Sequence, residues 1–190
     1  MNNKAHIVVD MLYDFIDGSM ACHNSQNAVR ESIRFINSNP GQQVFYITDS
    51  HPANHCSFIE NGGIWPAHCV KGTRGQQIHQ SYFTQVTDHC NRPCDANTLA
   101  KGEDPKQEQY SGFEAKDRAG KTLEEFLRDK GVQEVIVSGI ATEYCINATV
   151  SDLSDAGFKV SLIQEALAYV DRQGHEETLI KLQINGITMI

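Results

Sequence analysis

Short apolar runs alternate with segments of helical periodicity along most of the chain. The apolar runs predict six strands, at Ala5–Val9, Val44–Thr48, Thr98–Ala100, Val135–Ser138, Phe158–Ile163 and Ile187–Ile190. Apolar positions three and four residues apart predict helices between them, at Ala28–Asn37, Thr122–Leu127, Tyr144–Asp155 and Glu176–Leu182. Strands that alternate with helices indicate βαβ units. We therefore expect a three-layer α/β/α, Rossmann-like fold, with helices covering both faces of a mostly parallel six-stranded sheet.

One long stretch interrupts this alternation. The segment from Ser50 to about Gly75 has no periodic pattern and is rich in glycine and proline. Loops of this length in compact domains are usually functional or disordered. Because no linker, internal repeat or low-complexity tract divides the rest of the chain, we expect a single domain over residues 1–190.

Composition narrows the class of function. A net charge of -8 argues against nucleic acid as a partner, since phosphate binding needs clustered Lys and Arg. No apolar run approaches the ~20 residues that span a bilayer, so we expect no membrane partner. The N-terminal segment lacks the pattern of a secretion signal, which predicts a cytoplasmic protein. Its six cysteines should then be mostly free thiols.

The pair His89-Cys90 and the nearby Cys94 suggest either a small metal knot or a polar surface loop. No fourth ligand is evident in the sequence. We favour the surface loop.

Four ionisable or nucleophilic residues end or follow predicted strands, namely Asp10, Asp49, Lys101 and Cys145. Carboxyl ends of parallel strands share one edge of the sheet, where ligands bind. Cys145 should lie in the first turn of a helix with Thr142 as its N-cap, a position that favours a thiolate. The helix end supplies only ~0.3–1 kcal/mol. Bringing a thiol of pKa ~8.5 to neutrality takes roughly 2 kcal/mol, so other groups must help.

A carboxylate and an ammonium group can supply that help. Our hypothesis is that Asp10 accepts the proton of Cys145, while Lys101 holds Asp10 and stabilises the charged pair. Taken singly, Asp10 could cap a turn and Lys101 could be a surface lysine. Taken as a set, the three residues favour catalysis.

A second group of polar residues occupies the long loop. Asp49, His51 and His68 could point at one ion, with His55 as a less certain fourth ligand or a donor behind the ligands. One carboxylate and two or three imidazoles suit zinc, iron or manganese with open water positions. Lone histidines are more often structural, and four others invite no functional interpretation: His6, His23, His79 and His175.

Two aromatic residues lie near these groups in the sequence. Trp65 is the only tryptophan, and Phe15 follows the edge of the first predicted strand. They could sandwich a flat ring near the nucleophile, or they could pack within loops.

Five sequence blocks together resemble the nicotinamidase/pyrazinamidase branch of the isochorismatase-like hydrolases. The blocks are Val8–Phe15, Thr48–Pro52, Trp65–Thr73, Lys101-Gly102 with Tyr110–Phe113, and Gly139–Cys145. Each block is modest alone, but together they are specific and extend over most of the chain. The resemblance implies the isochorismatase-like hydrolase fold and hydrolysis of nicotinamide to nicotinate and ammonia through a thioester.

The same resemblance implies roles for individual residues. It implies a catalytic triad of Asp10, Lys101 and Cys145, and metal ligands Asp49, His51 and His68, with His55 ligating in some members. It implies one divalent metal ion, with zinc expected first and iron or manganese as alternatives. It also implies a cis peptide between Ile140 and Ala141, an oxyanion hole of the Ala141 and Cys145 amides, and substrate contacts from Phe15, Trp65, Ile140, Ala141 and Tyr144. Relatives often form dimers or larger assemblies, so we expect a homo-oligomer.

The chain departs from the family pattern after Phe15, where Ile16–His23 replaces a Pro-Gly-Gly run. This segment lines the pocket mouth in the family and bears on substrate preference. Three other functions compete: an amidase for carbamoyl or ureido groups, an isochorismate-type hydrolase, and a non-catalytic metal-binding or thiol-sensing protein. The metal motif argues against the first, the cysteine against the second, and the combination of Asp10 and Lys101 against the third.

Overall fold

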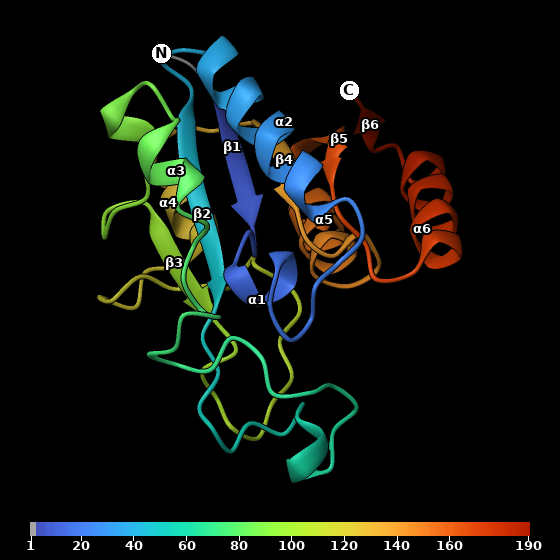
Figure 1. Ribbon diagram of the computed structural model, residues 1–190. Coiled ribbons are helices and arrows are strands. Elements are labelled where there is room, and N and C mark those ends of the chain that lie inside the picture. The colour runs from blue at the N-terminus through green and yellow to red at the C-terminus, as the bar shows by residue number, and fades with distance from the viewer. Residues whose placement is uncertain (1–2) are drawn as a thin grey trace.

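The computed structural model describes residues 3–190 and contains one six-stranded sheet within them (Figure 1). The strand order is β3-β2-β1-β4-β5-β6, and every neighbouring pair is parallel. The strands are β1 (Lys4–Val9), β2 (Gln43–Asp49), β3 (Thr98–Lys101), β4 (Glu134–Gly139), β5 (Lys159–Leu167) and β6 (Thr188–Met189). The predicted six-stranded sheet is confirmed, and it is parallel throughout.

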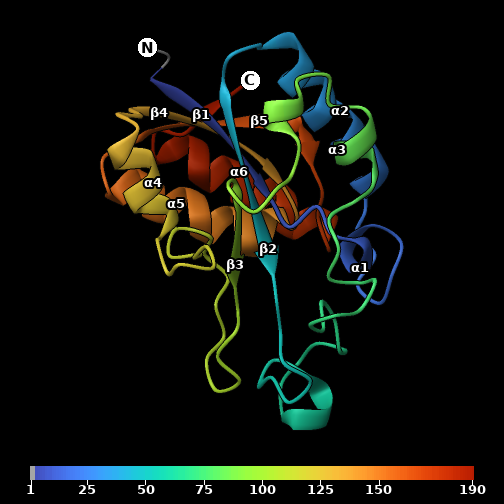
Figure 2. The same ribbon diagram turned by 90° about the vertical axis from the view of Figure 1, so that its left-hand side faces the viewer.

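Helices cover both faces of this sheet (Figure 2). One face carries α1 (Tyr13–Ile16), α2 (Ser25–Ser38) and α3 (Ser81–Thr84). The other carries α4 (Leu123–Asp129), α5 (Asn147–Asp155) and α6 (Arg172–Ile184). Three short helical turns complete the elements: η1 (Ile59–Asn61), η2 (His89–Asn91) and η3 (Thr142–Ile146). The predicted α/β/α layering is confirmed.

The alternation of side chains along β1 explains the two cores. Ile7 and Val9 are buried among the residues of α4, α5 and α6, while Val8 is buried with Val29 and Ile33 of α2. Successive strand residues point to opposite faces, so a strand that is apolar at every position must be covered on both sides.

Element boundaries differ from the prediction where polar residues enter buried elements. β5 continues four residues beyond Ile163, because exposed Gln164 and Glu165 are followed by Ala166 and Leu167, which return to the core. The short helices α1 and α3 have only four residues each, too few to show a helical period.

The topology places a crevice beside β1. The chain runs from β1 to β2 on one side of the sheet and later enters β4 on the other side of β1. Ligands bind at such a switch point, outside the carboxyl ends of the strands. The long segment after β2 projects beyond this edge (Figure 1). Across residues 3–190, no helix combines the length and hydrophobicity that a membrane span requires.

Candidate active site and metal centre

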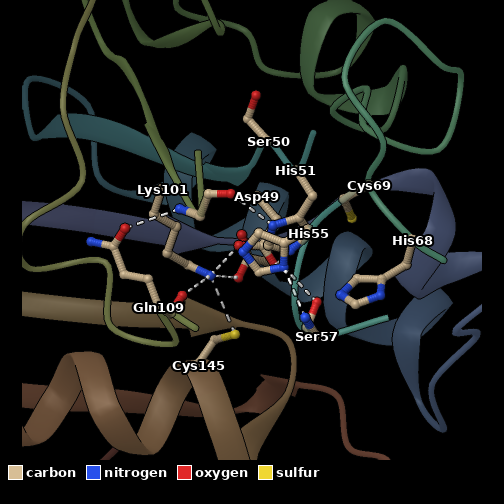
Figure 3. Close-up of polar contacts among 12 residues, drawn as sticks. Asp49, Ser50, His51, His55, Ser57, His68, Cys69, Lys101, Gln109 and Cys145 are labelled. Atoms are coloured by element: carbon tan, nitrogen blue, oxygen red, sulfur yellow. Dashed lines mark hydrogen bonds and ion pairs between the residues drawn. The ribbon is translucent and has the colours of Figure 1, made fainter. Parts of the chain in front are cut away.

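Three reactive side chains, those of Asp10, Lys101 and Cys145, meet beyond the carboxyl ends of the strands. Figure 3 shows the ammonium group of Lys101 beside the sulfur of Cys145. The Nζ atom of Lys101 lies 3.0 Å from Oδ2 of Asp10 and 3.5 Å from Sγ of Cys145. An Asp10 oxygen and the Cys145 sulfur belong to a group of atoms that all lie within 4.8 Å of one another. All three residues are buried. The structure therefore brings together the nucleophile, the carboxylate and the ammonium group that the sequence singles out.

Strand ends fix the positions of these groups. Asp49 and Lys101 are the last residues of β2 and β3, and they are register partners in the parallel ladder. Nζ of Lys101 donates to Oδ1 of Asp49 at 2.5 Å, so one ammonium group touches both carboxylates. Asp10 follows β1 with a left-handed φ of 52°, and its amide donates to the carbonyl of Ile47. The backbone thus turns immediately after the strand and leaves the carboxylate at the edge.

Burial and charge set the protonation of the three groups. Burial lowers the pKa of Lys101, but Asp10 and Asp49 outweigh it and raise that pKa well above its usual value. Burial and the nearby Asp49 raise the pKa of Asp10 to about 7, against the opposing effect of Lys101. Burial also raises the pKa of Cys145 well above the value of a free thiol, although Lys101 opposes this. Burial therefore favours a resting thiol over the thiolate expected from the sequence, beside a carboxylate able to accept the proton.

The start of the nucleophile helix also differs from the prediction. Residue Ala141, not Thr142, is the N-cap of η3, a π-helical turn in which the amide of Ile146 donates to the carbonyl of Ala141. Thr142 is already helical, and its hydroxyl donates to the carbonyl of Ala168. Cys145 thus lies in this first wide turn, directly before α5.

The metal-ligand candidates form a second cluster around Asp49. One ligand atom from each of Asp49, His51 and His68 lies within 4.8 Å of the others, and all three residues are buried. Nδ1 of His51 lies 2.9 Å from the carbonyl of Gly102, and Nδ1 of His68 lies 2.8 Å from the carbonyl of Pro66. These carbonyls favour the tautomers with the proton on Nδ1, which turns each Nε2 inward; Nε2 of His51 lies 3.5 Å from Oδ2 of Asp49. One carboxylate oxygen and two imidazole nitrogens, each oriented by a backbone group, fit a catalytic zinc ion.

His55 lies beside this cluster but not within it. Its ring stacks near that of His51, with 4.1 Å between the centroids. Its Nδ1 is 2.7 Å from the hydroxyl of Ser57, and its Nε2 is 3.1 Å from the carbonyl of Gln107. Both ring nitrogens of His55 have protein partners, and its ring lies beside that of His51. Its ligation stays a prediction.

A small pocket joins the two clusters. Its walls include Asp49, His68 and Cys145 on the reactive side, and Phe15, Trp65, Ala141 and Tyr144 on the side expected to contact substrate. The ring of Phe15 lies 5.6 Å from that of His68, and the ring of Trp65 lies 5.1 Å from that of Tyr144. The aromatic residues predicted to hold a flat ring therefore surround the space between the sulfur and the metal-ligand candidates.

The segment between β4 and η3 has the expected cis peptide between Ile140 and Ala141. Ala141 lines the pocket, and its amide has no hydrogen-bond partner among residues 3–190. The side chain of Ile140, in contrast, is fully buried in the core formed with α2. Ile140 was predicted to contact substrate, but its side chain does not line the pocket.

Several pocket residues are not among those that the sequence predicts to contact substrate. The pocket wall also includes Met20, Cys22, Glu108, Tyr110 and Val170. Tyr110 belongs to one of the matching blocks, whereas Met20 and Cys22 belong to the segment that departs from the family. Cys90 and Cys94 are exposed free thiols, and no cluster of metal-ligand atoms in the described chain includes them.

Comparison of the chain with known proteins shows the family to which it belongs. The family model of the Isochorismatase domain matches residues 4–190, nearly the whole chain. The chain belongs to the isochorismatase family. A family member from Escherichia coli, named nicotinamidase, is 32% identical over 210 residues, which cover 100% of this chain and 95% of the other.

Two solved structures share the fold over nearly their full length. The pyrazinamidase of Pyrococcus horikoshii in complex with zinc has a TM-score of 0.85 and 34% identity, covering 99% of this chain and 98% of its own. The PnC1 protein of L. infantum in complex with nicotinate also has a TM-score of 0.85, with 27% identity, covering 98% of this chain and 91% of its own. The isochorismatase-like fold expected from the sequence is confirmed.

Proposed function

We propose that the chain is a zinc-dependent nicotinamidase that hydrolyses nicotinamide to nicotinate and ammonia. The observation that carries the proposal is the shared pocket. Cys145, which lies against Lys101, lines the same space as Asp49 and His68, two of the three residues of the donor set completed by His51. A thiol can attack the carboxamide carbon of nicotinamide, and a metal ion held in the same pocket can bind the ring nitrogen. The similarity to a nicotinamidase and to a nicotinate complex supports the same substrate.

Cys145 supplies the nucleophile. As the sulfur attacks the carboxamide carbon, Asp10 accepts the thiol proton, and Lys101 stabilises the negative charge that is shared between them. Asp10 then returns the proton to the departing nitrogen, which leaves as ammonia, and the acyl group remains on the sulfur as a thioester. Asp10 next accepts a proton from water, which attacks the thioester carbon. Nicotinate leaves, and the sulfur regains its proton.

The amides of Ala141 and Cys145 are our proposed donors to the oxyanion that forms in each attack. The unpartnered amide of Ala141 at the pocket wall supports this assignment. One such donor is commonly worth about 2.7–4 kcal/mol of transition-state stabilisation. The aromatic side chains of Phe15, Trp65 and Tyr144 would hold the ring and exclude water from it.

Asp49, His51 and His68 would hold the metal ion. A bound zinc ion would be a Lewis acid available to the ring nitrogen of the substrate. The sulfur is the nucleophile, so the metal's role here is orientation. The cation would also offset the charge of Asp49 beside Lys101.

The assembly and the cellular location stay predictions. All six cysteines are free thiols, which suits a reducing compartment such as the cytoplasm. A homo-oligomer and a single catalytic domain are expected from the family. Pyrazinamide is a ring carboxamide of the same shape and should also be hydrolysed.

The test is ammonia release from nicotinamide by wild-type protein, the Cys145→Ala variant and a Cys90→Ala control. Cys90 is an exposed thiol outside the pocket. We expect Cys145→Ala to lose turnover by at least a thousandfold while retaining zinc, and Cys90→Ala to match wild type. Chelation should abolish turnover and added zinc should restore it. Near wild-type turnover by Cys145→Ala, or faster release from a ureido substrate than from nicotinamide, would contradict the proposal.

A further inference from the structure

One residue in the loop after β3 contacts both Lys101 and Gly102 without lining the pocket. Gln109 is half-buried beside Lys101 (Figure 3). Its backbone carbonyl accepts a hydrogen bond from Nζ of Lys101 at 3.3 Å. Its side-chain oxygen Oε1 accepts one from the amide of Gly102 at 3.0 Å. The residue therefore holds the catalytic lysine and the next peptide at the same time.

Gly102, whose amide Gln109 holds, also contacts a candidate metal ligand through its carbonyl. The carbonyl of Gly102 accepts the Nδ1 proton of His51 at 2.9 Å. Gly102 has a left-handed φ of 71°, and a Cβ atom there would lie 2.4 Å from Cε1 of His51. The backbone of Gly102 thus packs directly on the imidazole, so a small shift of this turn would move both Lys101 and the acceptor of His51.

Other hydrogen bonds of the loop hold the neighbouring residues and leave the amide of Gly102 to Gln109. The amide of Gln109 donates to the carboxylate of Glu108, and the amide of Cys56 donates to the carbonyl of Pro105. The backbone amide of Gly102 has Gln109 as its side-chain acceptor. A residue of another kind at position 109 could keep the backbone contact to Lys101, but it would leave the amide of Gly102 without this partner.

We propose that Gln109 is a positioning residue that couples the catalytic triad to the metal site by fixing the turn at Lys101 and Gly102. The side-chain carbonyl is the required group, because it sets the plane of the peptide that follows Lys101. The carbonyl of Gly102 lies on the other side of the same Cα atom, so holding the amide restrains the turn that aims this carbonyl at Nδ1 of His51 and leaves Nε2 toward the metal site. This inference rests on the proposed function, because it assigns two linked roles within that site.

The experiment compares Gln109→Leu, Gln109→Glu and Gln107→Leu with wild type in the full chain. Leu matches glutamine in size but lacks the acceptor, whereas Glu retains it. Gln107 lies in the same loop, is exposed, and uses its backbone carbonyl, not its side chain, to contact His55. Zinc affinity is measured on metal-free protein by competition with a chromogenic chelator. Steady-state kcat and KM are measured separately at saturating zinc.

We expect Gln109→Leu to lose about 10-fold in zinc affinity and about 10-fold in kcat, the low end of losses seen when groups that orient metal ligands are removed. KM should change less, since Gln109 does not line the pocket. Gln109→Glu should recover most of both losses, and Gln107→Leu should match wild type.

Unchanged zinc affinity and kcat in Gln109→Leu would overturn the proposal. Equal losses in Gln107→Leu, or losses in Gln109→Leu that Gln109→Glu does not recover, would also overturn it, since they would indicate general loosening of the loop. The two proposals fail separately. Absence of ammonia release by the wild-type protein would refute the nicotinamidase assignment, while the zinc titration would still decide the role of Gln109.

Discussion

Replacement of Lys101 by methionine should destabilise the protein in a manner that depends on pH. The Lys101 ammonium is fully buried and lies 3.0 Å from Asp10 and 2.5 Å from Asp49. Methionine retains the length of the side chain but removes the charge. The variant would leave two buried carboxylates with no cation between them, in protein kept free of metal.

The magnitude follows from the burial of these groups. Removing one partner of a buried ion pair typically costs about 3–5 kcal/mol, because the other charge is left uncompensated. For a chain of this size, each kcal/mol lowers Tm by roughly 2–4 °C, so we expect a fall of about 6–20 °C. Without Lys101, burial holds the folded pKa of Asp10 and Asp49 above the unfolded value of ~3.9. As pH rises above about 4, the two carboxyl groups lose their protons in the unfolded state before they do so in the folded state. This difference favours unfolding, so the variant loses stability relative to wild type as pH rises.

Urea unfolding of metal-free wild type and Lys101→Met at pH 5 and pH 8 measures this effect. The loss should be larger at pH 8. The double variant Lys101→Met with Asp10→Asn should regain part of the stability at pH 8, since one of the two carboxylates becomes neutral. A loss below about 1 kcal/mol at pH 8, or equal losses at both pH values, would refute the electrostatic reasoning.

Two further predictions concern particular backbone and core positions. Gly102→Ala should lower zinc affinity by at least about 10-fold, because the added Cβ would clash with His51. The control is Gly120→Ala, at a position that also has a left-handed φ but has no atom within 4 Å of the added Cβ; it should lose only about 1–2 kcal/mol of stability and keep its zinc affinity. Equal zinc affinity in the two variants would contradict the clash with His51. Burial lowers the pKa of His6 to about 3, so the stability that its neutral ring contributes is full above pH 6.5 and is lost as pH falls toward 3. Between pH 7 and pH 5 this loss should be about 2 kcal/mol in urea unfolding, and an unchanged pH dependence in His6→Gln would disprove the assignment.

The sequence predicts the sheet well because buried parallel strands are continuous apolar runs. It also predicts the meeting of Asp10, Lys101 and Cys145, since each follows a strand and parallel strands end at one edge. This inference needs only strand order in the chain, not the packing of helices. The sequence also identifies the metal-ligand candidates in the long segment, because carboxylate and imidazole groups are common metal ligands even in a segment without regular secondary structure.

Packing decides the features that the sequence could not provide. The pKa of Cys145 depends on how deeply the sulfur is buried, and the desolvation that raises this pKa outweighs the opposing effect of Lys101. The start of η3 at Thr142 depends on the carbonyl of Ala168, which lies far along the chain and takes the hydroxyl that would otherwise cap the helix. Gln109 is a polar loop residue in the sequence, and its significance emerges only when the loop folds back on Gly102.

The place of β3 in the sheet has a consequence for how the protein would be inactivated. β3 has four residues and a single neighbouring strand, β2, with one isolated bridge from Ala100 to Lys116 on its other side. An outermost strand of this kind can detach at far lower free energy than the central strands. Detachment would withdraw Lys101 from both carboxylates while the rest of the sheet stays intact. Mild heat or denaturant would thus inactivate the protein by detaching β3, before the whole molecule unfolds.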